Sequence, residues 1–250
     1  FNYLIKKYKG DKYIMIYTCW NQLLTMIFGQ LSNQESLRDL IVAMEAHAGK
    51  LYHLGIGKSV TRSNLSKANE QRDCRIFEEY AAFMIAEARK RRIYKIFELD
   101  GHGYAFDPTT IDLCLSVFEW AKFRKHKGGI KLHTIYDIEA EVPAFVYITP
   151  ANIHDSKAMP EIPYEPGAHY VFDRGYNDFS NLYTINRIGA FFVVWAKTNV
   201  RIKPKTRKRR LPESVVSDVI GCFTVYKSSW DYPEELRKLI VEDPEDGTRY

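Results

Sequence analysis

The spacing of apolar residues changes near residue 92, and this change constrains the fold more than any other feature of the 250-residue chain. Upstream, apolar side chains recur every three or four residues, which places them on one face of a helix. Downstream, they form short runs or alternate with polar residues, which favours strands. The sequence therefore predicts a helical domain over residues 1–92, followed by a domain built on a sheet.

Residues 1–92 are expected to form a small helical bundle, with helices over 19–28 and 35–44 and a long helix from Ser63 onward. Gly55 and Gly57 mark a turn before that helix. Short helices that lead to a basic cluster at 89–92 also suit a module that contacts DNA. Both interpretations, a plain bundle and a DNA-binding domain, are open for this region.

Residues 93–200 predict a mixed sheet flanked by helices, a fold class between α+β and α/β. The expected strands cover 93–99, 103–107, 129–137, 142–149, 168–173 and 190–196, and the expected helices cover 155–162 and 177–188. The strands at 129–137 and 142–149 are typical of a hairpin. A meander followed by strand–helix units is the RNase H-like arrangement. Further on, 201–210 is expected to be a basic loop, and 218–226 and 236–242 are strand candidates.

Two of the predicted strands each deliver an aspartate to a turn. Asp107 is followed by Pro108, and Asp173 by Arg174 and Gly175. Hard cations such as Mg²⁺ and Mn²⁺ prefer carboxylate oxygen and complete their shell with water and substrate phosphates. A single aspartate is more often a turn or cap residue, but two at strand ends predict a divalent-metal site that acts on a phosphate-bearing substrate.

The charge distribution points to a polyanionic partner. The net charge is +5 and the sequence pI about 8.8, and the basic residues gather at 89–92, 122–127 and 201–210. Each run alone is more often a solvated face. Three runs that flank the two acids make nucleic-acid phosphate the expected partner.

The composition is that of an ordinary globular protein, with 46% hydrophobic and 27% charged residues. No apolar run approaches the roughly 20 residues needed to cross a bilayer, and residues 1–7 do not form a signal peptide. A cytoplasmic protein without a membrane partner is expected.

The cysteines lack CxxC spacing, so buried free thiols are expected at Cys19, Cys74, Cys114 and Cys222. Both ends, at Phe1 and Tyr250, look like cuts in a longer chain.

Several short segments along the chain occur together, in this order, in one known family. They are 35–39 (ESLRD), 50–55 (KLYHLG), 107–116 (DPTTIDLCLS), 120–124 (WAKFR), 127–134 (KGGIKLHT), 165–168 (EPGA), 173–176 (DRGY) and 189–193 (GAFFV). Independent motifs in the right order are specific where one alone is weak. Over almost its whole length the chain resembles DDE transposases of bacterial insertion sequences, in the group whose third acid lies on a helix with the YREK signature.

The resemblance implies a helical N-terminal domain over 1–92, an RNase H-like catalytic core over 93–200 and the start of a β-rich insertion over 201–250. It assigns Asp107 and Asp173 as the first two catalytic acids, which with the third would hold two Mg²⁺ or Mn²⁺ ions. It implies a homodimer on double-stranded DNA, at the terminal inverted repeats and the target, in the bacterial nucleoid. Candidate DNA contacts are Arg124, Lys127, Lys131, Arg174 and Lys197; a surface salt bridge is an equal alternative for Arg174 and Lys197.

Three departures from the family pattern are visible. Pro108 stands where a serine commonly follows the first acid, and Trp195 stands where a polar or basic residue is expected. No segment between Asp173 and Tyr250 has the spacing of the signature helix, so the third acid, a glutamate, is expected beyond residue 250. On this interpretation the chain lacks activity by itself.

Other site residues have less specific interpretations. His133 is expected to be structural or to face DNA rather than to bind metal, and Asp155, beside His154, to cap a helix as readily as to bind metal.

Three functions are compatible with the sequence. The first is an insertion-sequence transposase that cleaves and joins DNA; the second is an inactive remnant that only binds DNA or interferes with an intact enzyme. The third, which rests on analogy of fold, is a metal-dependent nuclease or phosphohydrolase.

Overall fold

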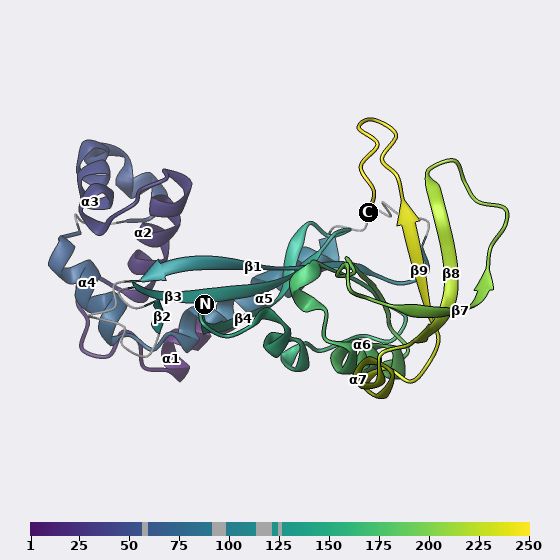
Figure 1. The fold of residues 1–250 in the computed structure, drawn as a ribbon. Coiled ribbons are helices and arrows are strands. Elements are labelled where there is room, and N and C mark those ends of the chain that lie inside the picture. The colour runs from purple at the N-terminus through teal and green to yellow at the C-terminus, as the bar shows by residue number, and fades with distance from the viewer. Residues whose placement is uncertain (57–59, 92–98, 114–121, 125–126) are drawn as a thin grey trace. The chain divides into compact units, whose positions relative to one another are not determined.

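The structure is a computed structural model that describes residues 1–56, 60–91, 99–113, 122–124 and 127–250 (Figure 1). These residues form two compact units, Phe1–Glu87 and Ala88–Tyr250. Each unit has buried apolar clusters of its own, so each has a separate core. Within the described residues, no helix is long and apolar enough to cross a membrane.

The first unit is helical. Its elements are α1 (Asn2–Lys7), α2 (Cys19–Leu31), α3 (Leu37–Ala46), the 3₁₀ helix η1 (Ala48–Leu54), α4 (Arg62–Gln71) and the start of α5 (Arg75–Arg91). Thr18, Ser36 and Thr61 cap α2, α3 and α4 with their hydroxyl oxygens, each of which accepts a hydrogen bond from a first-turn amide. The helices predicted over 19–28 and 35–44 are thus confirmed.

The single long helix predicted from Ser63 is wrong, because the chain breaks between α4 and α5. Arg72 has an extended backbone, and its buried guanidinium donates to the Thr18 carbonyl at 3.1 Å and to Gln22 Oε1 at 2.7 Å. Asp73 then accepts a hydrogen bond from the Arg75 amide at 3.0 Å, at the start of α5. The apolar spacing of this segment would continue the helix, but the tertiary hydrogen bonds of Arg72 hold the backbone in an extended conformation.

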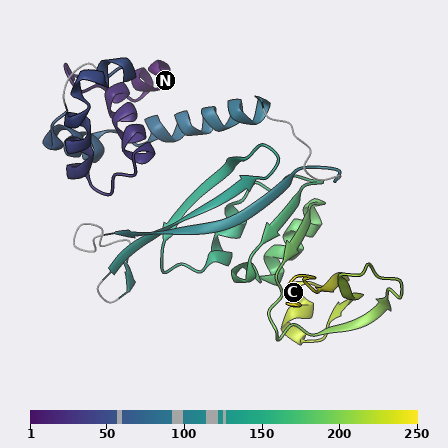
Figure 2. The same ribbon diagram turned by 90° about the horizontal axis from the view of Figure 1, so that it is seen from above.

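The second unit contains a mixed six-stranded sheet. Its strands are β1 (Gly103–Leu113), β2 (Lys122–Arg124), β3 (Lys127–Asp137), β4 (Val142–Pro150), β5 (His169–Phe172) and β6 (Phe191–Val194), in the order β2-β3-β1-β5-β6 with β4 also paired to β3. The pairs β1–β5 and β5–β6 are parallel and the others antiparallel. The helix α6 (Phe179–Ile188) lies against β6 (Figure 2). The predicted mixed sheet and its hairpin are confirmed.

Asp107 does not end its strand as predicted. β1 continues to Leu113 because β3 pairs with it over ten positions, from Tyr104 to Leu113. The parallel pairing with β5, however, stops at Phe106. Among the described residues, no strand pairs with that side of β1 beyond Phe106, and proline is tolerated at such an edge, which is compatible with Pro108. The strand predicted over 93–99 lies almost wholly outside the described residues.

A second, antiparallel sheet follows. It has the order β7-β8-β9, with β7 (Ile202–Arg207), β8 (Val215–Phe223), the helix α7 (Tyr226–Asp231) and β9 (Leu236–Val241). The loop predicted over 201–210 is therefore wrong for the residues of β7, since pairing with β8 extends this basic segment. Phe223 and Tyr232 join the same buried cluster as Tyr170 of β5 and Leu182 of α6.

The cysteines differ from their prediction. Cys19, Cys74 and Cys222 carry free thiols, but only Cys19 is buried, whereas Cys74 is exposed and Cys222 is partly buried. Cys114 lies outside the described residues.

Candidate active site

The register of two parallel strands brings the two predicted acids to neighbouring positions. Phe106 of β1 lies opposite Phe172 of β5, and both rings are buried, with their centroids 5.8 Å apart. Asp107 and Asp173 are the next residues on their respective chains, and both are exposed. Because side chains alternate across a strand, a buried aromatic pair is followed by a pair of carboxylates that reach solvent.

A third carboxylate lies beside this pair. Asp155 begins the 3₁₀ helix η3 (Asp155–Glu161), and its Oδ2 points at the same glycine as Asp173 Oδ1. A methyl group on Gly175 would lie 2.9 Å from Asp173 Oδ1 and 3.2 Å from Asp155 Oδ2. Asp173 Oδ1 also accepts a hydrogen bond from the Gly175 amide.

The capping role predicted for Asp155 is wrong. His154 caps η3, through an Nδ1 atom that accepts a hydrogen bond from the Ser156 amide at 3.3 Å. The sequence signal for Asp155 was the His-Asp pair after a strand, but nothing local indicated that this turn returns to Asp173.

The electrostatics of the site favour a cation. Burial raises the pKa of Asp107, and the charges of Asp173 and Asp155 raise it further. Tyr176 lies fully buried beneath them, and burial together with the three carboxylates raises the pKa of its hydroxyl. Lys131 Nζ pairs with Asp155 at 2.7 Å, and a divalent cation would supply positive charge beside Asp107 and Asp173.

Two carboxylates are suitable ligands for a magnesium-type ion that takes its remaining ligands from water and substrate. Among the described residues, no three His, Cys, Asp or Glu side chains are placed so that they could hold a metal ion together. Mg²⁺ usually binds to one or two carboxylates and takes its other oxygens from water and substrate phosphate. Asp107 and Asp173 are suitable for that role.

The comparison with known families decides the classification. The family model described as "Transposase DDE domain" matches residues 99–232, which include both aspartates. The chain belongs to this family. The resemblance to DDE transposases of insertion elements is thereby confirmed, and a second family model, "Domain of unknown function (DUF4372)", matches residues 1–57.

Two individual proteins are similar to this DDE transposase. "Putative transposase y4zB" of Sinorhizobium fredii (strain NBRC 101917 / NGR234) is 33% identical over 133 residues, which are 52% of this chain and 37% of that protein. The match thus spans little more than a third of the relative's length. Among solved structures, the piggyBac transposase in a synaptic complex with hairpin DNA is 11% identical, with a TM-score of 0.41 over 81% of this chain and 48% of that chain.

His133 supports the floor of the candidate site. Its ring is fully buried, with Nε2 2.9 Å from Thr149 Oγ1 and Nδ1 3.5 Å from the Tyr176 hydroxyl. Burial lowers the pKa of this imidazole, so the neutral form is favoured. Of the roles predicted for it, the structural one agrees with this position, and a DNA-facing one does not.

The predicted DNA-contact residues fall into three groups. Lys131 is largely buried, with Nζ 2.7 Å from Asp155 Oδ1 and donating to the Ile153 carbonyl at 2.9 Å, so its charge is already paired. Arg174 and Lys197 are exposed, and the Arg174 guanidinium lies 4.7 Å from the centre of the Trp195 ring. Arg124 and Lys127 lie in β2 and β3, but their side chains are outside what the structure describes.

One member of the basic cluster at 89–92 is also engaged with the sheet. Arg89 donates from Nε to Asp137 Oδ2 at 3.1 Å and from Nη2 to the Tyr104 hydroxyl at 2.6 Å. This arginine fastens the end of α5 to β1 and β3, so its charge is satisfied within the protein.

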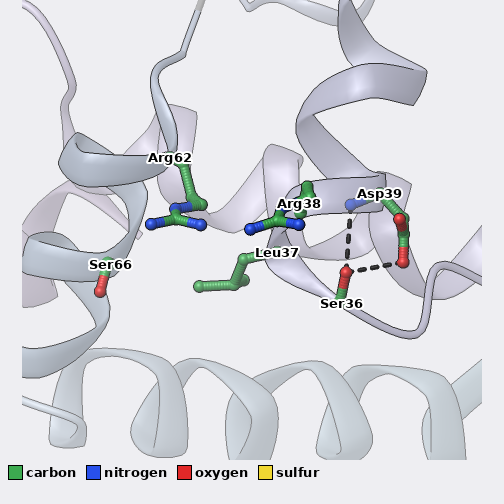
Figure 3. Close-up of a pocket in the computed structure, with 6 residues that line it drawn as sticks. All are labelled: Ser36, Leu37, Arg38, Asp39, Arg62 and Ser66. Atoms are coloured by element: carbon green, nitrogen blue, oxygen red, sulfur yellow. Dashed lines mark hydrogen bonds between the residues drawn. The ribbon is translucent and has the colours of Figure 1, made fainter.

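A separate hollow in the first unit is lined by arginines (Figure 3). Arg38, near the start of α3, and Arg62, the first residue of α4, point toward one another across it. The remaining lining residues are Ser36, Leu37, Asp39 and Ser66. This hollow lies in the first unit, whereas the acid pair belongs to the second.

Proposed function

We propose that the chain belongs to an insertion-sequence transposase that binds the ends of its element and cleaves and joins DNA with divalent metal ions. The register of β1 and β5 carries the proposal, because it sets Asp107 and Asp173 side by side within a DDE domain. An RNase H-like core, which uses strand-borne acids on a mixed sheet, is part of the proposal. So is a homodimer on double-stranded DNA.

In the proposed site, Asp107 and Asp173 hold Mg²⁺ or Mn²⁺ together with the third acid of the family. Two such ions, when bound, would activate water or a DNA 3′-hydroxyl and stabilise the leaving oxygen at phosphorus. The Gly175 amide orients Asp173. The buried Tyr176 and His133 close the floor beneath the acids to water. Arg174, held against Trp195, and Lys197 are the exposed cations offered to DNA phosphate.

The inactive-remnant interpretation gains no support from the site. Both acids are present in register, and the apolar floor below them is intact.

Metal binding by the 250-residue chain tests the acid pair directly. We expect Asp107→Asn and Asp173→Asn each to lower the affinity for Mn²⁺ by at least about tenfold, as measured by titration calorimetry, because each removes one of two charged ligands. Asp178→Asn is the matched control: Asp178 caps α6 and accepts from the Asn181 amide at 3.2 Å, a bond that asparagine can replace. Equal Mn²⁺ affinity in all four proteins would refute the site.

Strand transfer tests the activity. In the full-length transposase, Asp173→Asn should abolish joining of an element end to target DNA in a gel assay, because the remaining ligands cannot neutralise the developing charge. DNA binding should persist. Retained transposition by the variant would contradict the assignment.

A further inference from the structure

The motif at residues 35–39 builds the arginine-lined hollow of the first unit. Ser36 Oγ accepts from the Asp39 amide at 3.1 Å and donates to the Asp39 carboxylate at 2.6 Å, which fixes the start of α3. The Asp39 carboxylate, which also lines the hollow, is thereby held by Ser36. Leu37, which lies between Ser36 and Arg38 in the sequence, packs against the buried cluster of the unit.

The two facing arginines come from helices that share this core. Leu40 of α3 and Leu65 of α4 are almost completely buried in the same cluster. Arg38 and Arg62 are therefore presented by two fixed helix starts rather than by loose segments. The hollow between them opens to solvent, and both arginines are exposed.

The charge in the hollow is incomplete. Within the part of the chain that the structure describes, neither arginine forms an ion pair. Two guanidinium groups that point at one another repel, and an anion between them converts the repulsion into two attractive contacts. The planar, forked donors of arginine match phosphate oxygens, and the Ser66 hydroxyl adds a further donor.

We propose that Arg38 and Arg62 form a clamp for one backbone phosphate of DNA. The inference rests on the proposed function for its DNA partner. An open hollow suits a phosphate of a polymer that crosses the surface, since a small free anion needs a more enclosed site. The clamp contacts no base, so it adds affinity without sequence preference.

The test is the salt dependence of DNA binding by the whole chain, with a 30-base-pair duplex as the probe. Each phosphate contact contributes about 0.9 to the slope of log K against log salt, so Arg38→Gln with Arg62→Gln, which removes one such contact, should reduce the slope by about 0.9. At 0.1 M salt the affinity should fall roughly tenfold. Lysine at both positions should restore part of the slope.

Arg75→Gln is the control, because that exposed arginine of the same unit is already paired with Asp73 at 2.6 Å. An unchanged slope in the double variant, or an equal loss in Arg75→Gln, overturns the clamp. Inorganic phosphate is the probe for a small-anion site. If phosphate stabilises the wild-type chain against thermal unfolding but not the double variant, and the salt slope is the same in both, the hollow binds a small anion and the clamp is overturned. Mn²⁺ affinity should stay at the wild-type value in the double variant. If the wild-type chain binds no DNA even at low salt, the proposed function fails as well.

Discussion

Gly175 shows how closely single residues are constrained at the acid site. Its backbone amide holds Asp173, and its missing side chain leaves room for the carboxylates of both Asp173 and Asp155. Residue type at this position therefore controls the geometry of two acids. The requirement is one of space, because the φ angle of Gly175 is not among the positive values of the chain.

Substitution of this glycine should loosen the site and leave the fold intact. In Gly175→Ala the new methyl group would lie 2.9 Å from Asp173 Oδ1, so the carboxylate must turn away. We expect the Mn²⁺ affinity to fall severalfold while the far-ultraviolet circular dichroism stays unchanged. Gly49→Ala is the control, since nothing lies within 4 Å of its added methyl group. Unaltered Mn²⁺ binding by Gly175→Ala would show that Asp173 is not held as described.

His133 makes the stability of the protein depend on pH in one direction. Its pKa is lowered in the folded state by burial. As pH falls below about 6.5, the unfolded chain binds a proton that the folded chain excludes, so the free energy of unfolding decreases. The stabilisation that the neutral His133 ring provides is complete above pH 6.5. It is lost as pH falls from that value through the lowered pKa of the folded state.

We expect His133→Gln to flatten the dependence of unfolding free energy on pH between pH 7 and pH 5. The slope removed should approach about 1.4 kcal/mol per pH unit while the folded imidazole stays neutral. Urea unfolding at several pH values measures it. Parallel curves for wild type and variant would mean that the folded imidazole takes up the proton freely.

At the scale of elements, the small sheet is held by a charged pair across β8 and β9. Asp218, almost completely buried, accepts from Arg237 Nε at 2.8 Å and from Nη2 at 2.7 Å. These hydrogen bonds lower the pKa of Asp218 below its usual range. The stabilisation is therefore present above the ordinary value of 3.8 and is lost as pH falls through the lowered folded pKa.

Asp218→Asn should destabilise the chain at neutral pH, and its difference from wild type should shrink as pH falls below 3.8. Thermal melting between pH 2 and pH 7 checks this expectation. Glu235→Gln breaks an equally short but exposed pair with Lys205, at 2.7 Å, and should have little effect, because exposed pairs contribute little. Equal losses in the two variants would show that burial of Asp218 is unimportant.

For the whole molecule, the separate cores predict two regions that unfold independently. Leu65 belongs to the core of the first unit and Leu182 to that of the second, and both are fully buried. Truncation of a buried leucine to alanine typically costs about 2–5 kcal/mol. Leu65→Ala should therefore speed amide hydrogen exchange in residues 1–87 alone, and Leu182→Ala in residues 88–250 alone. Mass spectrometry resolves the two regions, and a joint response would show that they unfold as one.

Much of the fold was predictable where the signal is local. The helices α2, α3 and α6 and the strands β3 to β6 follow from apolar spacing and turn residues. The division of 63–88 into two helices was not predictable, because Arg72 is held by groups 50 and 54 positions away in sequence. The strand β7 was missed for a similar reason: its partner β8, not its own basic sequence, extends it.

The sequence by itself determined that two aspartates follow apolar runs, and the ordered motifs determined the transposase family. Only the tertiary structure decided that these carboxylates are neighbours, that Asp155 lies beside them, and that Lys131 forms an ion pair with Asp155. The physical reason is the range of the interactions. Apolar periodicity and capping act within a few residues, whereas strand register and the charge around a carboxylate depend on segments brought together from across the chain.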